Sequence, residues 1–348
     1  MRFFKGKQDE RAPITFDGVL CPLTGRPLAE VLLAMEDSAD SLRLTLPYPP
    51  AAVASELEEA LKPQLGGRVL HLEGQLPVYK KRLGGIKNMI AVASGKGGVG
   101  KSTTTINLAL ALYELGLKVA VLDADLFGPS LPMMLGTLDE HPESPDGKTM
   151  LPVAAHGLLT QSIGYLVNAA DAAVWRGPMA STALLQLVNE TRWPDVDLML
   201  IDMPPGTGDI QLTVSQKLPL TGAVIVTTPQ DLALADAIKG INMFEKVDVP
   251  VLGLIENMSY HHCPQCGHHS HLFGVHGGAD LAEKKGVPLL AEIPLTQAIR
   301  QFSDSGEPIV VGEPQCEESH AYIRAARQLL AELVKRPVPA QPIDIKMV

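Results

Sequence analysis

The 348-residue chain lacks long apolar runs, an excess of basic charge, and an abundance of cysteine. No uninterrupted apolar stretch approaches the roughly 18 residues that span a bilayer, and residues 1–10 contain no apolar segment of the signal-peptide kind. We therefore expect a cytoplasmic protein without a membrane partner. The 29 basic and 39 acidic residues leave a net charge of −10, which disfavours a broad contact with phosphate backbones. We expect no nucleic-acid partner.

Only four cysteines are present: Cys21, Cys263, Cys266 and Cys316. In a reducing compartment they are better explained as ligands or buried thiols than as disulfides. Hydrophobic residues make up 46% of the chain, which is ample for burial. The length suggests about two domains, at roughly 150 residues each.

The first part of the chain has the pattern of a small α+β domain. The alternation of Leu42, Leu44 and Leu46 predicts a half-buried strand, followed by a helix over residues 54–62 and a strand over residues 69–76. The predicted division of the chain is a small domain at 1–76, a basic, glycine-bearing linker at 77–87, a larger domain at 88–335 and a loose, proline-rich tail at 336–348.

In the larger domain, short apolar runs alternate with helical patterns. Buried strands are predicted at residues 88–94, 118–122, 197–201, 222–227, 249–255 and 287–293. This alternation predicts an α/β fold in which a parallel sheet carries helices on both faces and binds its ligand at the carboxyl ends of the strands.

A glycine-rich loop that matches the phosphate-loop pattern G-x-x-x-x-G-K-[ST] follows the first of these strands. Its glycines let backbone N–H groups converge on phosphates, Lys101 supplies positive charge, and Ser102 supplies a hydroxyl for Mg²⁺. A predicted helix over residues 103–115 directs its unpaired N–H groups at the bound anion. The predicted nucleotide-binding residues of the loop are Gly95, Lys96, Gly97, Gly98, Val99, Gly100, Lys101, Ser102 and Thr103.

The loop also contains a second lysine, Lys96, which is surplus to the needs of one nucleotide. A surplus charge suggests that Lys96 serves the nucleotide of a second chain, and hence a homodimer. We expect Lys96 and Lys101 to be catalytic.

Carboxylates follow two of the predicted strands. Asp202 comes after an apolar run, as a Walker B metal ligand does. We assign Asp125 to orienting the attacking water and Asp123 to supporting the loop and the Mg²⁺ shell, although aspartates at such positions also cap helices.

The guanine-reading sequence Asn-Lys-x-Asp is absent, so ATP is the expected nucleotide. Asn257 either meets the base edge or stabilises a loop.

Cys263 and Cys266 form a C-x-x-C metal-binding knuckle, in which two thiolates converge on one metal. A thiolate cage needs four ligands, and two knuckles from two chains supply them. Zn²⁺ and a [4Fe–4S] cluster both accept four thiolates, and the spacing does not choose between them. The alternatives are an inert or redox-active dithiol, or a Cys₂His₂ zinc site within one chain that uses the neighbouring histidines His261, His262, His268, His269 and His271.

These motifs resemble those of the Mrp/ApbC-type iron–sulfur cluster carriers, deviant Walker A ATPases related to MinD, ParA and nitrogenase iron protein. The resemblance covers residues 86–335 and depends most on the knuckle, since the phosphate loop alone indicates only the superfamily. The segments that carry it are 95–103 (GKGGVGKST), 123–130 (DADLFGPS), 201–209 (IDMPPGTGD), 228–236 (TPQDLALAD) and 256–259 (ENMS), followed by the C-x-x-C.

The resemblance implies an ATPase in which Lys101 and Ser102 hold phosphate and Mg²⁺ and Lys96 reaches the partner's nucleotide. It also implies that Cys263 and Cys266 share a labile [4Fe–4S] cluster across a homodimer, for transfer to apo-protein acceptors. The amino-terminal part is similar to the MIP18-like domain often fused to such carriers. It lacks the cysteine usual there, since residues 46–51 read LPYPPA.

Two rival functions remain open at this point. One is a positioning ATPase like MinD or ParA, which cycles on a membrane or nucleoid. Such a protein requires an amphipathic terminal helix or a basic face, and the proline-rich residues 336–342 provide neither. The other is a zinc-bridged scaffold that binds nucleotide without catalysis.

Overall fold

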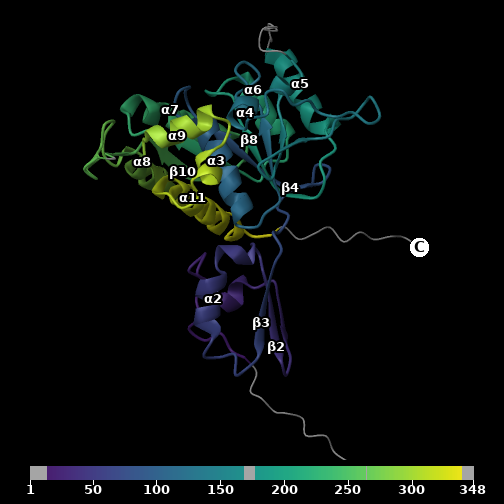
Figure 1. The fold of residues 1–348 in the computed structure, drawn as a ribbon, viewed down its shortest axis with the longest axis vertical. Coiled ribbons are helices and arrows are strands. Elements are labelled where there is room, and N and C mark those ends of the chain that lie inside the picture. Colours follow the sequence, from purple (N-terminus) through teal and green to yellow (C-terminus); the bar gives the residue numbers. More distant parts are fainter. Residues whose placement is uncertain (1–13, 168–176, 264, 339–348) are drawn as a thin grey trace, which may run out of the picture. The chain divides into compact units, whose positions relative to one another are not determined.

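The computed structural model describes residues 14–167, 177–263 and 265–338, which form two compact units divided after Pro77 (Figure 1). Residues 1–13 of the expected small domain and residues 339–348 of the expected tail lie outside the described residues. None of the helices in the described ranges combines the length and the apolar character needed to cross a bilayer.

The first unit is a three-stranded sheet with short helices. Its central strand β2 (Ser41–Leu46) buries Leu42, Leu44 and Leu46, as their alternation predicts. The order is β1-β2-β3, with β1 antiparallel and β3 parallel to β2. The edge strand β1 was not anticipated, because its four residues are exposed and lack an apolar pattern. The other elements are α1 (Leu28–Val31), β1 (Ala34–Asp37), η1 (Pro50–Ala52), α2 (Ala54–Leu61) and β3 (Val69–Gly74).

The second unit is built on an eight-stranded sheet in the order β13-β10-β9-β4-β8-β5-β7-β6. All pairs are parallel except β6–β7, which is an antiparallel hairpin at one edge. The strands are β4 (Ile86–Ala93), β5 (Val119–Asp123), β6 (Val153–Ala155), β7 (Leu158–Gln161), β8 (Val196–Asp202), β9 (Gly222–Thr227), β10 (Val251–Asn257) and β13 (Leu289–Ile293). The inner strands are buried along almost their whole length, as their uninterrupted apolar sequences require.

Helices cover both faces of this sheet. The connections from β4 to β5 and from β8 to β9 run in opposite directions along the sheet, and right-handed crossovers place their helices on opposite faces. Helices α3 and α11 pack against each other, while α7 packs on β9 and α8 on β10 (Figure 1). The helices are α3 (Lys101–Glu114), α4 (Leu131–Met134), α5 (Gly177–Glu190), α6 (Asp209–Lys217), α7 (Asp231–Lys246), α8 (Gly277–Lys285), α9 (Gln297–Asp304), α10 (Ile309–Gly312) and α11 (Glu317–Val334), with η2 (Ile163–Tyr165).

Two details differ from the sequence-based expectations. Strand β4 begins at Ile86, so the last two residues of the expected linker belong to the sheet. Arg336, expected in a loose tail, is half-buried. Its guanidinium lies 5.7 Å from the centre of the Tyr79 ring and donates a hydrogen bond to the carbonyl of Thr221. The cation–π contact and the hydrogen bond fasten the start of the tail to the second unit.

Candidate functional site: a phosphate loop and a cysteine hairpin

The phosphate loop joins β4 to α3 at the carboxyl edge of the sheet. A Cβ atom at Gly95 would lie 2.1 Å from the backbone carbonyl carbon of Asp236 in α7. A Cβ atom at Gly100, where φ is +78°, would lie 2.2 Å from the amide nitrogen of Asn257. Glycine is therefore required at both positions, because the loop is pressed against α7 on one side and the end of β10 on the other.

Asp202, at the end of β8, organises the start of α3. Its carboxylate accepts hydrogen bonds from Lys101 Nζ at 2.5 Å, Ser102 Oγ at 2.6 Å and Thr105 Oγ1 at 2.8 Å. The Lys101 and Asp202 side chains are both almost fully buried, so this ion pair is largely desolvated. Thr105 was missed by the sequence reasoning, although it lies one helical turn beyond Lys101 and so shares its face.

The donor set fits a nucleotide bound with Mg²⁺. Ser102 and Asp202 present hydroxyl and carboxylate oxygens, the hard ligands that Mg²⁺ prefers. Lys101 already lies beside them, at the amino end of α3, where the helix dipole and free N–H groups favour phosphate. The glycine cradle supplies the space that a phosphate needs.

Asp123, at the end of β5, lies next to Asp202 in the sheet register and is buried. Its carboxylate accepts hydrogen bonds from the Asp125 N–H at 3.1 Å, the Leu131 N–H at 3.3 Å and Ser162 Oγ at 3.0 Å. Burial, with the nearby Asp202 carboxylate, raises the pKa of Asp123 far above its usual range. The carboxylate thus holds the 124–131 loop in place. Ser162 was not anticipated as its partner.

Asp125 is half-buried and lines a cavity of about 350 Å³ beside the phosphate loop. The cavity lies between the loop after β5 and the loop after β8, which includes Pro204 and Pro205. Gln211 holds the second loop by donating to both proline carbonyls, at 2.9 and 2.6 Å. Burial raises the pKa of Asp125, and the Lys101 charge opposes that shift. A carboxylate so placed has room beside it for a water molecule.

Asn257 contacts the phosphate loop in this structure. Its side-chain amide donates a 2.8 Å hydrogen bond to the Val99 carbonyl, and the residue is buried. Of the two roles considered for Asn257, this geometry is that of a loop-stabilising residue.

Its neighbour Glu256 is fully buried and accepts hydrogen bonds from Ser259 Oγ at 2.6 Å and from the Gly278 N–H. Apart from its place in the E-N-M-S segment, no local sequence pattern indicates this buried carboxylate.

The knuckle is the tip of a small hairpin that follows directly from Asn257. Strands β11 (His261–His262) and β12 (His269–Ser270) pair antiparallel. Backbone hydrogen bonds close the tip, from Cys263 N to the His268 carbonyl at 3.0 Å and from Gly267 N to the Cys263 carbonyl at 2.9 Å. The Cys266 and Gln265 N–H groups lower the pKa of the Cys263 thiol, which favours the thiolate that binds metals. Cys266 is exposed and Cys263 is half-buried.

Aromatic and acidic side chains hold the base of the hairpin. The Tyr260 and His269 rings stack with centroids 5.2 Å apart, and His262 lies 4.7 Å from His269 across the hairpin. Glu317, the first residue of α11, accepts a 3.0 Å hydrogen bond from the Tyr260 hydroxyl and lies 3.8 Å from His262 Nδ1. Since α11 packs on α3, the hairpin is tied to the helix that begins at Lys101.

Within residues 14–167, 177–263 and 265–338, no three His, Cys, Asp or Glu side chains are grouped so that they could hold a metal ion. The histidines near the knuckle make other contacts. His261 Nδ1 lies 3.0 Å from the Leu295 carbonyl and His271 Nδ1 lies 3.2 Å from the Ser259 carbonyl. This geometry does not support a zinc site within one chain.

The two other cysteines lie outside the hairpin. Cys21 is buried in the first unit, with its sulfur 2.9 Å from the Tyr48 hydroxyl. Cys316 caps α11, where its sulfur accepts the Ser319 N–H, and burial raises the pKa of its thiol. Both are free thiols in structural positions.

Lys96 lies in the phosphate loop and is half-buried. Ser94 Oγ donates a 2.9 Å hydrogen bond to the Lys96 carbonyl, which fixes the backbone of the loop at this position. Gly95 packs on Asp236 of α7. Lys96 is the next residue, so it comes directly after the contact between the loop and α7.

A parallel sheet, a glycine loop that opens a helix, and a Walker B aspartate bound to that loop define this molecule as a P-loop NTPase. Comparison with known proteins extends this conclusion. A family model described as ParA, NUBPL iron-transfer P-loop NTPase, matches residues 85–330. The chain belongs to this family.

Individual relatives agree with the family match. An iron–sulfur cluster carrier protein from Haemophilus influenzae is 57% identical over 249 residues, which cover 72% of this chain and 67% of that protein. One from Escherichia coli strain K12 is 50% identical over 312 residues, 86% of this chain and 85% of that protein. Among solved structures, a nucleotide-binding protein from Archaeoglobus fulgidus in complex with ADP superposes with a TM-score of 0.59 at 38% identity, over 68% of this chain and 91% of that chain.

Proposed function

We propose that this protein carries a labile [4Fe–4S] cluster, held by two copies of the chain, and delivers it to apo-protein acceptors in a cycle driven by ATP hydrolysis. The observation that carries the proposal is the incomplete thiolate pair. Cys263 and Cys266 are presented at a hairpin tip, and the described part of the chain adds no third ligand to them. Relatives named as iron–sulfur cluster carriers, up to 59% identical, support the identity of the cargo.

We assign the nucleotide contacts as follows. Lys101 and the N–H groups of the loop bind the phosphates, and Ser102 and Asp202 hold Mg²⁺. Bound Mg²⁺ supplies charge neutralisation on the phosphate oxygens. Binding of phosphate draws Lys101 away from Asp202 and leaves the carboxylate for the metal. Asp123 supports the loop through its hydrogen bonds and is not itself a ligand in this proposal.

Hydrolysis then needs an oriented water and a second positive charge. Asp125 accepts a hydrogen bond from the attacking water in the cavity beside the loop. Lys96 of the partner copy stabilises the charge that develops on the γ-phosphate, as an arginine finger does in other P-loop NTPases. The nucleotide thus holds the two copies together until it is cleaved.

The opening and closing of the dimer also act on the cluster. Its four thiolates belong to two hairpins, so opening of the dimer strains or exposes it and favours its transfer to an acceptor with its own thiolates. The connection from loop to hairpin is short, because only five residues separate Asn257 from Cys263 and the Asn257 side chain contacts the loop.

The test is anaerobic reconstitution of the protein with iron and sulfide, followed by visible absorption and iron and sulfide analysis. A straw-coloured dimer with about four irons is expected. Cys263→Ala should lose the cluster, and Cys316→Ala, which removes a thiol outside the hairpin, should retain it. A colourless protein that contains zinc would contradict the cluster assignment and favour a zinc-bridged scaffold.

A further inference from the structure

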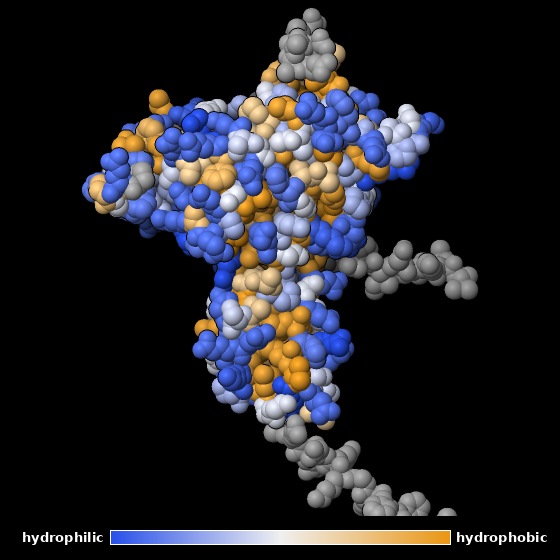
Figure 2. Space-filling view, viewed as in Figure 1, coloured by the Kyte–Doolittle hydropathy of each residue, from blue (hydrophilic) through white to orange (hydrophobic). Residues whose placement is uncertain are grey.

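The cysteine hairpin belongs to a longer stretch, residues 259–278, which we call the hairpin segment. It begins after β10 and ends in the first turn of α8, which packs on β10. It projects beside α8 at the edge of the second unit (Figure 1), where Figure 2 shows hydrophilic and hydrophobic residues mixed at the surface. Residues 261–263 and 265–277 are exposed or half-buried, so this part of the segment has no core of its own. The contacts at its base therefore decide its position.

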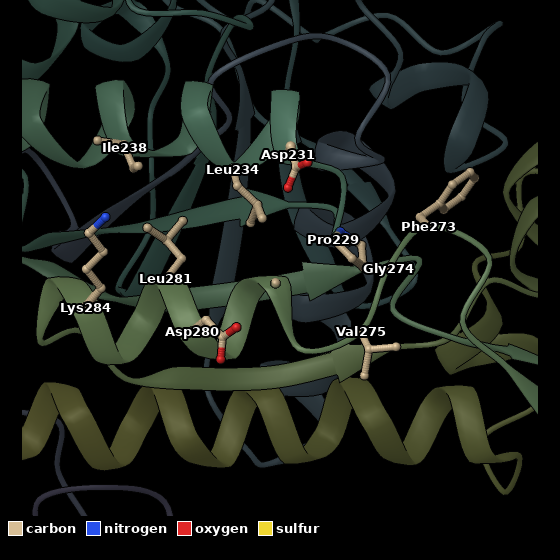
Figure 3. Close-up of a pocket in the computed structure, with 11 residues that line it drawn as sticks. Pro229, Asp231, Leu234, Ile238, Phe273, Gly274, Val275, Asp280, Leu281 and Lys284 are labelled. Carbon is tan, nitrogen blue, oxygen red and sulfur yellow. The ribbon is translucent and has the colours of Figure 1, made fainter.

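One buried carboxylate holds both ends of the hairpin segment. Glu256 accepts a 2.6 Å hydrogen bond from Ser259 Oγ, at the first residue of the segment, and another from the Gly278 N–H, at its last. A Cβ atom at Gly278 would lie 2.5 Å from Glu256 Oε2, so glycine is required for the helix backbone to approach the carboxylate. Figure 3 shows the last part of the segment, which passes Phe273 and Val275 before it enters α8. A buried carboxylate is costly without such donors, so Glu256 closes the base of the segment.

The turn that follows Glu256 lies against the phosphate loop. Beside the hydrogen bond from Asn257 to the Val99 carbonyl, the Met258 side chain also reaches the loop, because a Cβ atom at Gly100 would lie 3.6 Å from its terminal methyl carbon. Met258 has a φ of +57°, in the left-handed region that residues with a side chain seldom adopt. The turn is therefore a strained piece of backbone held between the loop and the contacts of Glu256.

We propose that Met258 transmits nucleotide binding at the phosphate loop to the cysteine hairpin, through the base that Glu256 closes. This inference rests on the proposed function, because it makes the hairpin that holds the cluster respond to the nucleotide. Phosphates that enter the loop shift the backbone around Gly100, and Met258 moves with it because the two are in contact. The backbone changes at Met258, where it is already strained, and the shift reaches the hairpin through Ser259. Met258 is thus a positioning residue.

Backbone strain is concentrated at the base of the hairpin segment. The described part of the chain contains four residues other than glycine with a positive φ, and two of them, Met258 and His276, lie at the two ends of this segment. Strained residues persist where the surrounding contacts hold them, and they occur where the backbone switches between conformations. The second link between the hairpin and the loop runs from Glu317 through α11, which is a regular helix of 18 residues. The route through Met258 is therefore the one built to change.

Hydrogen exchange of the full, cluster-free chain, followed by mass spectrometry with and without Mg²⁺ and ADP, tests this proposal. In the wild type, ADP should slow exchange in the phosphate loop and change exchange in the hairpin by at least about threefold. Met258→Gly removes the side chain that reaches Gly100 and relieves the left-handed backbone. It should keep the protection of the loop and lose the change in the hairpin. A residue that served only the stability of the fold would alter exchange equally with and without ADP.

The matched control is Asp248→Gly, in the turn after α7, where φ is +55°. It relieves the same backbone conformation at a distant turn, and its hairpin should respond to ADP as the wild type does. A second variant, Glu256→Gln, tests the base of the segment, because it keeps the shape of the side chain and removes the charge that Ser259 and Gly278 bind. Hairpin exchange should rise about tenfold with and without ADP. Glu283→Gln, which removes an equal charge from α8, should leave it unchanged.

The outcomes separate this inference from the proposed function. A wild-type hairpin that does not respond while ADP protects the loop, or an equal response in Met258→Gly, would overturn the role of Met258. Equal exchange in Glu256→Gln and Glu283→Gln would overturn the role of Glu256. These experiments involve neither cluster nor hydrolysis, so such results leave the proposed carrier intact. A wild-type chain that shows the response but takes up no cluster on reconstitution would instead contradict the proposed function, and a phosphate loop that ADP does not protect would contradict both.

Discussion

Asn257 donates a hydrogen bond to the carbonyl of Val99, across 158 residues of sequence, and so joins the end of β10 to the phosphate loop. The same residue begins the short segment that leads to the cysteine hairpin. The phosphate loop and the cysteine hairpin are thus parts of one packed structure.

Asn257→Ala is expected to weaken nucleotide binding by about tenfold, because loss of a buried hydrogen bond of roughly 1–3 kcal/mol leaves the Val99 carbonyl unpaired and the loop less ordered. Titration with fluorescent ADP measures this. The control is Asn242→Ala in α7, which removes a side-chain hydrogen bond donated by Lys285 of α8, outside the loop. Equal affinity in the two variants would show that the Asn257 contact does not order the loop.

Asp202→Asn is expected to destabilise the nucleotide-free second unit by roughly 3 kcal/mol, because it leaves the Lys101 charge buried without a counter-ion. Ser102→Ala keeps that ion pair and should cost only about 1 kcal/mol. Trp193 is buried in the second unit. Its fluorescence in a urea titration therefore reports the unfolding of that unit. An Asp202→Asn protein as stable as the wild type would contradict the importance of this ion pair.

Lys96→Ala is expected to lower ATP hydrolysis by about a hundredfold or more while ATP still binds, because only the developing charge on the γ-phosphate is left without its partner. Asp125→Asn should be inactive for a different reason, since it lacks the residue that orients water.

A mixture of these two inactive variants tests whether Lys96 acts across the dimer. In a mixed dimer, the site on the Lys96→Ala copy has its own Asp125 and receives Lys96 from the other copy. A one-to-one mixture should therefore recover about one quarter of the wild-type rate, since half the dimers are mixed and each has one complete site. If Lys96 serves its own nucleotide, the mixture will stay inactive.

Glu317→Ala is expected to shorten the half-life of the bound cluster about threefold, because Tyr260 and His262 lose the acid that holds the base of the hairpin at α11. The control is Glu318→Ala, which removes an equal charge from the same helical turn. Decay of the visible absorption under a chelator gives both rates. Identical decay in the two variants would exclude a role for the Glu317 contacts.

Local sequence patterns predicted the elements that place the site. Uninterrupted apolar runs predicted β4, β5, β8, β9, β10 and β13, and the glycine pattern predicted the turn into α3, because burial and backbone freedom act within a few residues. The inner strand β7, of four residues, was missed. The edge strands β1 and β6 were missed, since one is fully exposed and the other has three residues. An edge strand is stabilised by its neighbour in space more than by its own sequence.

The partners within the site could not be predicted in the same way. Thr105 and Ser162 contact Asp202 and Asp123 across long stretches of chain, and Gln211 supports the Pro204–Pro205 turn from the next helix. Each is an ordinary polar residue whose role appears only when the strands are side by side. For Asn257 the sequence left two roles open, and the contact with Val99 could only be seen in three dimensions.

The most direct test of the account is sedimentation equilibrium of the anaerobically reconstituted, nucleotide-loaded protein, with iron and sulfide counted on the same sample. The account predicts a dimer that contains about four irons and four sulfides per two chains. A monomer that holds a complete cluster, or a dimer without iron, would contradict it.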